Sequence, residues 1–242
     1  MAKDKSAGTG GSRQATVRVK TAKRRKTSST RWLQRQLNDP YVAEAKRLGY
    51  RSRAAFKMIQ IDDKFRLLKR GGRVIDLGCA PGGWTQIAVD RVGSDKGSGV
   101  VIGMDLLPVE PIPGATLLQA DFLGDDALDM LAAVMPDAEG KPAVDVVLTD
   151  MAASGTGHAS TDHLRIIGLA EAALDFAVGV LRPGGGFVAK VFSGGAEATL
   201  LQTLKANFAK VSHFKPPASR KESAEMYVVA TGFTPTKRNE DN

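Results

Sequence analysis

Residues 74–84 have the sequence VIDLGCAPGGW, in which an apolar run ends abruptly at a loop with three glycines and a proline. Glycine loses more conformational freedom on folding than other residues, so a cluster of glycines indicates that another group must approach the backbone closely. The apolar run predicts a strand and the residues after the loop predict a helix. The fold class follows if this strand-loop-helix pattern is repeated along the rest of the chain.

The sequence after residue 70 alternates between short apolar runs and helical stretches. This alternation predicts an α/β protein with a Rossmann-like, mostly parallel sheet of seven strands and helices on both faces. The segment 182–186 (RPGGG) predicts the end of a helix and a tight turn. The predicted strands are 73–77, 99–104, 115–119, 144–149, 186–192, 210–214 and 226–231, and the predicted helices are 83–91, 126–135, 162–181 and 196–207.

The net charge of +8 is unevenly distributed along the 242 residues, with +8 in residues 1–30, +7 in residues 31–70 and −7 in residues 71–242. Residues 1–30 contain almost no apolar side chains and predict a disordered basic tail. The remaining domain, 31–242, divides into a basic helical front (31–70), ended by Gly71-Gly72, and a sheet core (71–233). A basic front on an acidic body is typical of a nucleic-acid-binding protein.

Composition excludes several classes of protein. Hydrophobic residues make up 43% and charged residues 25% of the chain, as in soluble globular proteins. We expect neither a membrane span nor a signal peptide, because no apolar run is long enough. The single cysteine, Cys79, excludes an internal disulfide and fits a reducing compartment, so we expect a cytoplasmic protein. His158, His163 and His213 have no metal-ligand spacing, and we expect no metal.

Acidic residues follow three of the predicted strands. Asp105 and Asp150 come directly after apolar runs, and Asp121-Phe122 come shortly after a third. In open α/β sheets, ligands bind outside the carboxyl ends of the strands. We therefore expect these side chains to converge on one crevice.

Lys190 lies inside the apolar run 187–192 (FVAKVF), which is typical of a strand buried on both faces. A lysine is almost never fully buried without a partner. One interpretation is a side chain that extends to solvent from a strand end. The other is a lysine held in the crevice, where a neutral amine could accept a proton.

The glycine loop is compatible with more than one class of nucleotide or nucleoside ligand. Gly78, Gly82 and Gly83 do not match the dinucleotide pattern G-x-G-x-x-G, because Ala80 occupies its second glycine position, and no Walker lysine follows. An acid such as Asp105 suits the ribose diol of either cofactor class. A loop without a phosphate fingerprint favours a nucleoside ligand without phosphate, such as S-adenosylmethionine, whose positive charge acids can balance.

The sequence resembles the FtsJ/RrmJ family of ribosomal RNA large-subunit 2′-O-ribose methyltransferases over about residues 31–233. Several motifs in the same order carry this resemblance, and together they are far more specific than a glycine loop alone. They are RSRAAFK (51–57), DLGCAPGGW (76–84), DLLP (105–108), TDMA (149–152), KVF (190–192) and EMYVVA (225–230).

The resemblance implies an S-adenosylmethionine-dependent enzyme that needs no metal and methylates the ribose 2′-hydroxyl of a uridine in large-subunit ribosomal RNA, on an assembled or assembling subunit. The implied catalytic tetrad is Lys57, Asp150, Lys190 and Glu225, with Lys190 as the base. If strand 226–231 is antiparallel, Glu225 lies at the same edge as Lys190. The implied cofactor contacts are Gly82, Gly83, Trp84, Asp105, Asp121, Phe122 and Asp150.

The chain departs from the family pattern at three places, namely Cys79, Ala153 (in place of a proline that would stiffen the loop after Asp150) and the slightly extended loop 139–142. Asp76 could either brace the glycine loop or contact the ligand. We expect RNA contacts through residues 31–57 and the basic tail, with phosphate contacts from Lys46, Arg47, Arg51 and Arg53.

Three alternatives stay open. One is a nicotinamide-dependent oxidoreductase, which the glycine spacing disfavours. Another is an RNA-binding assembly factor without catalytic activity, which the intact tetrad disfavours. The third is a 2′-O-methyltransferase that acts on transfer RNA or on the messenger RNA cap.

Overall fold

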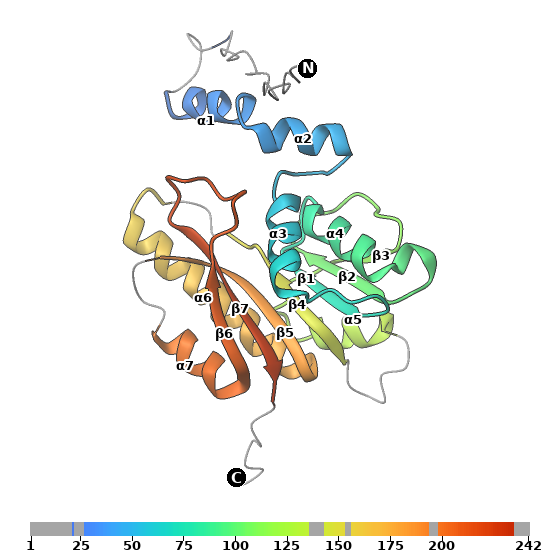
Figure 1. The fold of residues 1–242 in the computed structure, drawn as a ribbon. Coiled ribbons are helices and arrows are strands. Elements are labelled where there is room, and N and C mark those ends of the chain that lie inside the picture. The colour runs from blue at the N-terminus through green and yellow to red at the C-terminus, as the bar shows by residue number, and fades with distance from the viewer. Residues whose placement is uncertain (1–20, 22–26, 136–142, 153–155, 194–197, 235–242) are drawn as a thin grey trace, which may run out of the picture.

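A computed structural model of the chain describes residue 21 and residues 27–135, 143–152, 156–193 and 198–234. Its centre is a seven-stranded sheet with the strand order β3-β2-β1-β4-β5-β7-β6 (Figure 1). The pairs from β3 to β5 in this order are all parallel, and β7 runs antiparallel to both of its neighbours, β5 and β6. The predicted α/β fold with a mostly parallel sheet is therefore confirmed.

The strands lie where the sequence predicts them, apart from their ends. β5 is longer than predicted, because the RPGGG segment forms an irregular first part of the strand, with a shift of register opposite Val144 and Val146. The strands are β1 Arg73–Leu77, β2 Val100–Asp105, β3 Ala115–Gln119, β4 Val144–Thr149, β5 Leu181–Phe192, β6 Phe208–Phe214 and β7 Glu225–Phe233.

The helices of the core also match the prediction to within three residues at either end. No helix in the described ranges is both long enough and apolar enough to cross a membrane. The helices are α1 Thr27–Leu37, α2 Pro40–Leu48, α3 Ala55–Phe65, α4 Gly83–Val92, the short 3-10 helix η2 Ser94–Lys96, α5 Ala127–Val134, α6 Ala159–Val180 and α7 Ala198–Asn207.

The basic front differs from the prediction in two ways. Helix α1 begins at Thr27, so the last residues of the predicted tail are helical, while residues 1–20 and 22–26 lie outside the described part of the chain. Helix α3 ends at Phe65 rather than at the glycine pair, because Arg66 takes the left-handed conformation (φ 55°) and closes the helix with a hydrogen bond to the Asp62 carbonyl. The front is thus three separate helices.

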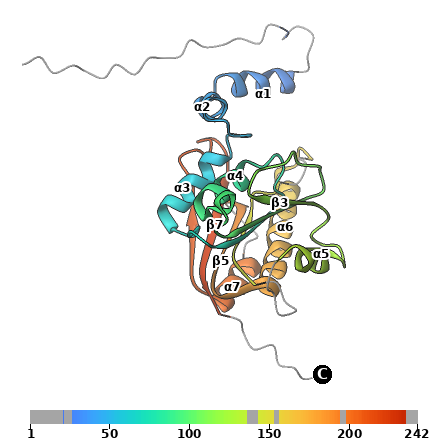
Figure 2. The same cartoon turned by 90° about the vertical axis from the view of Figure 1, so that its right-hand side faces the viewer.

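The core consists of two apolar layers, one on each face of the sheet (Figure 2). Helices α3 and α4 cover one face through residues such as Met58 and Ile87. Helices α5, α6 and α7 cover the other face through residues such as Leu131 and Leu174. Side chains alternate between the two faces along each strand, as pleated geometry requires. Helices α1 and α2 lie beyond the edge at which the parallel strands end (Figure 1).

Candidate active site

Four chain segments meet at the carboxyl edge of the sheet. Asp150 follows the last residue of β4, and Lys190 lies two residues before the end of β5. Since β7 is antiparallel, its first residue, Glu225, pairs with Phe192 and lies at the same edge. Lys57 comes from α3, which covers this part of the sheet. The placement of Glu225 at this edge was conditional on an antiparallel strand, and β7 is antiparallel.

The four residues of the predicted tetrad form one network of charged groups. Lys57 Nζ lies 2.8 Å from Glu225 Oε2 and 3.6 Å from Asp150 Oδ2. Lys190 Nζ lies 3.1 Å from Asp150 Oδ1 and donates to the Asp150 carbonyl oxygen at 2.6 Å. Only 7% of Lys57 and 8% of Lys190 is exposed. Two buried ammonium groups are tolerable because each one is paired with a carboxylate.

Tyr227 is a fifth member of this network, and it is absent from the tetrad predicted from the sequence. Its hydroxyl donates to Asp150 Oδ1 at 2.7 Å and accepts from Lys57 Nζ at 3.0 Å. The side chain is fully buried, and its ring centroid lies 5.5 Å from that of Trp84. Tyr227 is two residues after Glu225 on a strand, and side chains at this spacing lie on the same face. That spacing is the signal that could have indicated it.

The network sets the ionisation of its own members. Burial alone would raise the pKa of Asp150, but the charges of Lys57 and Lys190, with the hydrogen bond from Tyr227, outweigh burial and lower it. Asp150 is therefore a carboxylate at neutral pH. Burial, followed by the charges of Asp150 and Glu225, raises the pKa of Tyr227 well above its ordinary value. The tyrosine therefore keeps its proton and remains a hydrogen-bond donor.

The glycine loop between β1 and α4 is crowded by the chain itself. Gly78 has a φ of 69° and Gly82 a φ of 108°, both in the left-handed region that favours glycine. A β-carbon on Gly78 would also collide with the Met151 side chain, and one on Gly83 would collide with the Ser52 hydroxyl. These glycines allow the loop to pack closely against the segments that carry Asp150 and Lys57.

Asp105 and Trp84, two of the residues predicted to contact the cofactor, lie at this loop. Asp105 Oδ2 accepts from the Ala80 amide and Oδ1 from the Leu107 amide, both at 2.8 Å, so this acid braces the glycine loop. Trp84 is buried, and its indole N–H donates to the Ala54 carbonyl oxygen at 2.9 Å.

Asp121 and Phe122 follow β3 at the same edge. Asp121 Oδ1 accepts from the Leu123 amide at 3.0 Å, and Phe122 packs edge-on against Phe176. No group of three potential metal ligands occurs among the residues that the structure describes.

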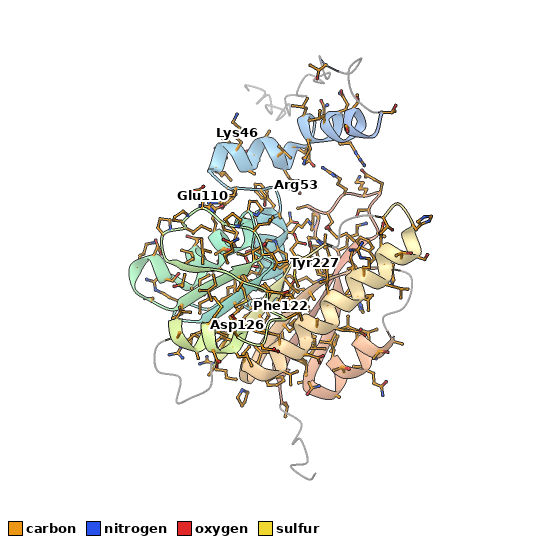
Figure 3. All side chains as sticks on the ribbon, turned by 180° about the vertical axis from the view of Figure 1, so that it is seen from behind. Lys46, Arg53, Glu110, Phe122, Asp126 and Tyr227 are labelled. Atoms are coloured by element: carbon orange, nitrogen blue, oxygen red, sulfur yellow. The ribbon has the colours of Figure 1, made fainter. Side chains whose placement is uncertain are left out.

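Two of the predicted phosphate ligands have other partners. The Arg51 guanidinium donates to the carbonyl oxygens of Pro81, Glu110 and Pro111 at 3.1, 2.7 and 2.7 Å, and thereby ties the glycine loop to the loop after β2. Arg53 donates to the Ala218 carbonyl oxygen and lies beside α2 (Figure 3). Both guanidinium groups therefore have partners inside the protein, and their contacts with phosphate stay a prediction.

The other two predicted phosphate ligands lie on α2. Arg47 forms an ion pair with Glu44 on the helix surface, at 2.6 Å. Lys46 is exposed and points away from the sheet (Figure 3). Lys46 therefore remains a candidate for contacts outside the protein.

Comparison with known proteins agrees with this geometry. The family model described as FtsJ-like methyltransferase matches residues 50–233, which include every residue of the network. The chain belongs to the FtsJ-like methyltransferase family. The resemblance seen in the sequence and the expected methyltransferase class are thus confirmed.

Members of the FtsJ-like family from bacteria are close in sequence over almost their whole length. The chain is 70% identical over 226 residues to a protein of Paramagnetospirillum magneticum named Ribosomal RNA large subunit methyltransferase E, covering 93% of this chain and 91% of that one. It is 60% identical over 233 residues to the protein of the same name from Parvibaculum lavamentivorans, covering 93% and 90%. The crystal structure of a Plasmodium falciparum ribosomal RNA methyltransferase is similar with a TM-score of 0.68 and 29% identity, covering 77% of this chain and 100% of that one.

Proposed function

We propose that the protein transfers a methyl group from S-adenosylmethionine to the ribose 2′-hydroxyl of a uridine in large-subunit ribosomal RNA, in the cytoplasm. The observation that carries this proposal is Lys190, an amine within the apolar run 187–192 of β5, whose Nζ is held by Asp150 at the carboxyl edge of the sheet. The names of the close relatives support the choice of RNA. Only RNA offers the 2′-hydroxyl.

The residues at the edge fit a cofactor with a ribose and a positive charge. Asp105 supplies a carboxylate at the glycine loop, and Asp121 and Phe122 follow β3 at the same edge of the sheet. Each carboxylate oxygen that accepts from a backbone amide has a second lone pair for a ligand hydroxyl. S-adenosylmethionine would supply a methyl group already activated by its sulfonium, so the protein has to align the reactants and remove one proton.

Lys190 would act as the general base in this reaction. Lys190 is an ammonium in the resting network, so it would first have to release one proton to solvent. Its neutral amine would then accept the proton of the 2′-hydroxyl as the new oxygen–carbon bond forms and the sulfur–carbon bond breaks. Alignment can contribute about 7–11 kcal/mol and a general base about 10²–10⁴-fold. Asp150 fixes the direction of the Lys190 side chain through two contacts, one from its carboxylate and one from its carbonyl oxygen.

Lys57, Glu225 and Tyr227 would hold Asp150 and the target ribose in place. Lys57 bridges the two carboxylates, and Tyr227 binds the same Asp150 oxygen as Lys190 does. A pure RNA-binding protein has no need for this buried set of charges, which costs free energy to desolvate. The complete network therefore favours an enzyme over an assembly factor. Transfer RNA and the messenger RNA cap are the alternative substrates.

The proposal is tested by following radiolabelled methyl transfer from S-adenosylmethionine to large ribosomal subunits and to naked ribosomal RNA, both from cells that lack the enzyme. We expect a 2′-O-methyluridine at one site. Lys190→Ala should lower the rate at least about 100-fold, since it removes the base. Its affinity for S-adenosylmethionine should change by less than about twofold, because Asp150, the predicted cofactor contact that Lys190 touches, keeps its contacts with Tyr227 and Lys57.

Lys205→Ala is the matched control, because Lys205 is an exposed lysine on α7. It should leave both the rate and the affinity unchanged. Methylation of a base instead of a ribose, or full activity of Lys190→Ala, would contradict the proposal. Transfer to transfer RNA alone would move the assignment to that substrate.

A further inference from the structure

A groove runs along the carboxyl edge between helices α1 and α2 on one side and the β6–β7 connection, residues 215–224, on the other. Its volume is about 930 Å³. A smaller cavity of about 260 Å³ borders it and reaches Glu225 of the catalytic network. Arg35, Arg53 and Arg220 line both hollows. The groove is thus a path along the protein surface that ends at the proposed catalytic residues.

Helix α3 and Arg53, two residues before it, fix the wall formed by the β6–β7 connection. The Ala218 amide donates to Gln60 Oε1 at 2.7 Å, and the Ala218 carbonyl oxygen accepts from Arg53 Nη2 at 2.5 Å. Gln60 is three residues after Lys57, so both side chains lie on one face of α3. The helix that supplies Lys57 to the catalytic network therefore also positions this wall.

The same wall contacts the catalytic network directly. Ser219 is 6% exposed, and its hydroxyl donates to Glu225 Oε1 at 2.8 Å. The other carboxylate oxygen of Glu225 accepts a hydrogen bond from Lys57 Nζ. Ser219 therefore fixes the Glu225 side chain, and the next residue in the chain, Arg220, faces the groove. A ligand held by Arg220 would lie beside the catalytic residues at a defined position.

The groove carries an excess of positive charge. Asp39 Oδ2 is shared between Arg53 Nε at 3.0 Å and Arg220 Nη2 at 3.3 Å, so one carboxylate faces two guanidinium groups. Arg35 projects from the exposed side of α1. Each guanidinium has five N–H donors, which leaves donors on Arg35 and Arg220 for a ligand. The basic residues that line the groove are Arg35, Arg53, Arg220 and Lys221, and the acidic residues are Asp39 and Glu222.

We propose that this groove binds the RNA backbone beside the target ribose, with Arg35 and Arg220 donating to the oxygens of a phosphodiester. A ribose that reaches Lys190 carries its neighbouring phosphates past Glu225, where the groove opens. Guanidinium groups match the geometry of phosphate oxygens and fix position without reading sequence. The inference rests on the proposed function and adds the binding site that holds the strand.

The test measures RNA binding by filter retention as a function of salt, with a ribosomal RNA fragment that contains the methylated site. Each lost phosphate contact should reduce the slope of log affinity against log salt by about 0.7, the value for single strands. Arg35→Ala and Arg220→Ala should each show this reduction and an increase in KM of about tenfold. Their kcat and their affinity for S-adenosylmethionine should stay within about twofold of the parent protein, because neither arginine is in the catalytic network.

Lys205→Ala on α7 removes the same charge outside the groove and is the control. A slope for Arg35→Ala and Arg220→Ala equal to that of Lys205→Ala would overturn the groove as the RNA site. Arg35 lies on the helix surface, so its variant tests the proposal even if Arg220→Ala disturbs the Asp39 contacts. If the two variants reduce the salt slope of RNA binding but the parent protein transfers no methyl group to RNA, the groove is still the RNA-binding site and the proposed reaction is rejected.

Discussion

Asp76 is a carboxyl group that the proposed reaction does not use. It lies on β1 with 1% of its surface exposed, and Thr85 Oγ1 of α4 donates to its Oδ2 at 2.7 Å. The sequence left open whether this acid braces the loop or contacts the ligand, and the contact shows that it ties the strand before the glycine loop to the helix after it. Burial is the main reason that the pKa of Asp76 rises from 3.8 to about 7, and the nearby charges of Asp150 and Asp105 add to the effect.

The raised pKa of Asp76 makes the stability of the protein depend on pH. Between 3.8 and about 7 the folded protein keeps a proton that the unfolded chain releases, so this group makes the protein less stable as pH rises through that window. Asp76→Asn keeps the shape and cannot ionise. We therefore expect the free energy of unfolding of the variant, relative to the parent, to increase by roughly 2–3 kcal/mol between about pH 5 and about pH 8. Urea unfolding at both pH values measures it, and an equal difference at both would contradict the shift.

Single residues differed in how far the sequence could predict them. Lys190 was recognisable because a charge inside an apolar strand needs a partner. Lys57 and Glu225 were identified through the family resemblance, since a lysine on a basic helix and a glutamate before a strand are ordinary surface residues by pattern. Tyr227 was missed because an aromatic residue on a buried strand is usually part of the core, and only its contact with Asp150 indicates another role.

At the scale of elements, strands were predicted more accurately than the front helices. Strands buried in a parallel sheet form uninterrupted apolar runs, which are visible in sequence. The breaks within the front were not predicted, although Asp39 caps the start of α2 before Pro40 and Gly49 ends α2 in the left-handed conformation. The end of α3 was not predicted either, because the left-handed residue there is Arg66, which pattern alone does not mark as a helix terminus.

Arg51 gives a prediction at this scale, because it connects two loops. Its guanidinium holds the carbonyl oxygens of Pro81 and of residues 110–111, so Arg51→Ala should loosen the glycine loop. We expect the dissociation constant for S-adenosylmethionine to rise about tenfold, consistent with the loss of hydrogen bonds from a charged donor. Isothermal titration measures it. The salt slope of RNA binding should stay unchanged, whereas a slope lower by about 0.7 would make Arg51 a phosphate ligand after all.

At the scale of the whole molecule, the charge distribution predicts a contribution of the N-terminal segment to RNA binding. Residues 1–26 contain all nine lysines and arginines of the predicted tail, and helix α1 begins directly after them. Deletion of residues 2–26 should therefore weaken RNA binding at low salt and flatten its salt dependence, while methyl transfer at saturating RNA is retained.

Filter binding over a range of salt concentrations, alongside methyl transfer, measures both effects. The deletion must stop at residue 26, because a longer one removes the start of α1, the helix that carries Arg35. A salt slope equal to that of the full chain would show that the segment makes no contact with RNA.

The groove could not be predicted from sequence, since its two walls are far apart in the chain. Arg53 meets Ala218 across 165 positions, and Gln60 meets the same residue across 158. Local patterns carry no information about such pairs. The sheet edge was predictable because a general rule places the ends of parallel strands together. No comparable rule places a connection between two late strands against an N-terminal helix.

The position of β7 has a consequence for the time at which the protein becomes active during its own synthesis. β7 is inserted between β5 and β6, and in the described part of the sheet β6 pairs with no other strand. A nascent chain emerges from its N-terminus at about 5–20 residues per second. Until residues 225–233 have emerged, β6 has no neighbour to join, and Lys57 lacks both Glu225 and Tyr227. The glycine loop is made well before this moment and Lys190 about 2–7 s before Glu225 at this rate, but the catalytic network closes only with β7.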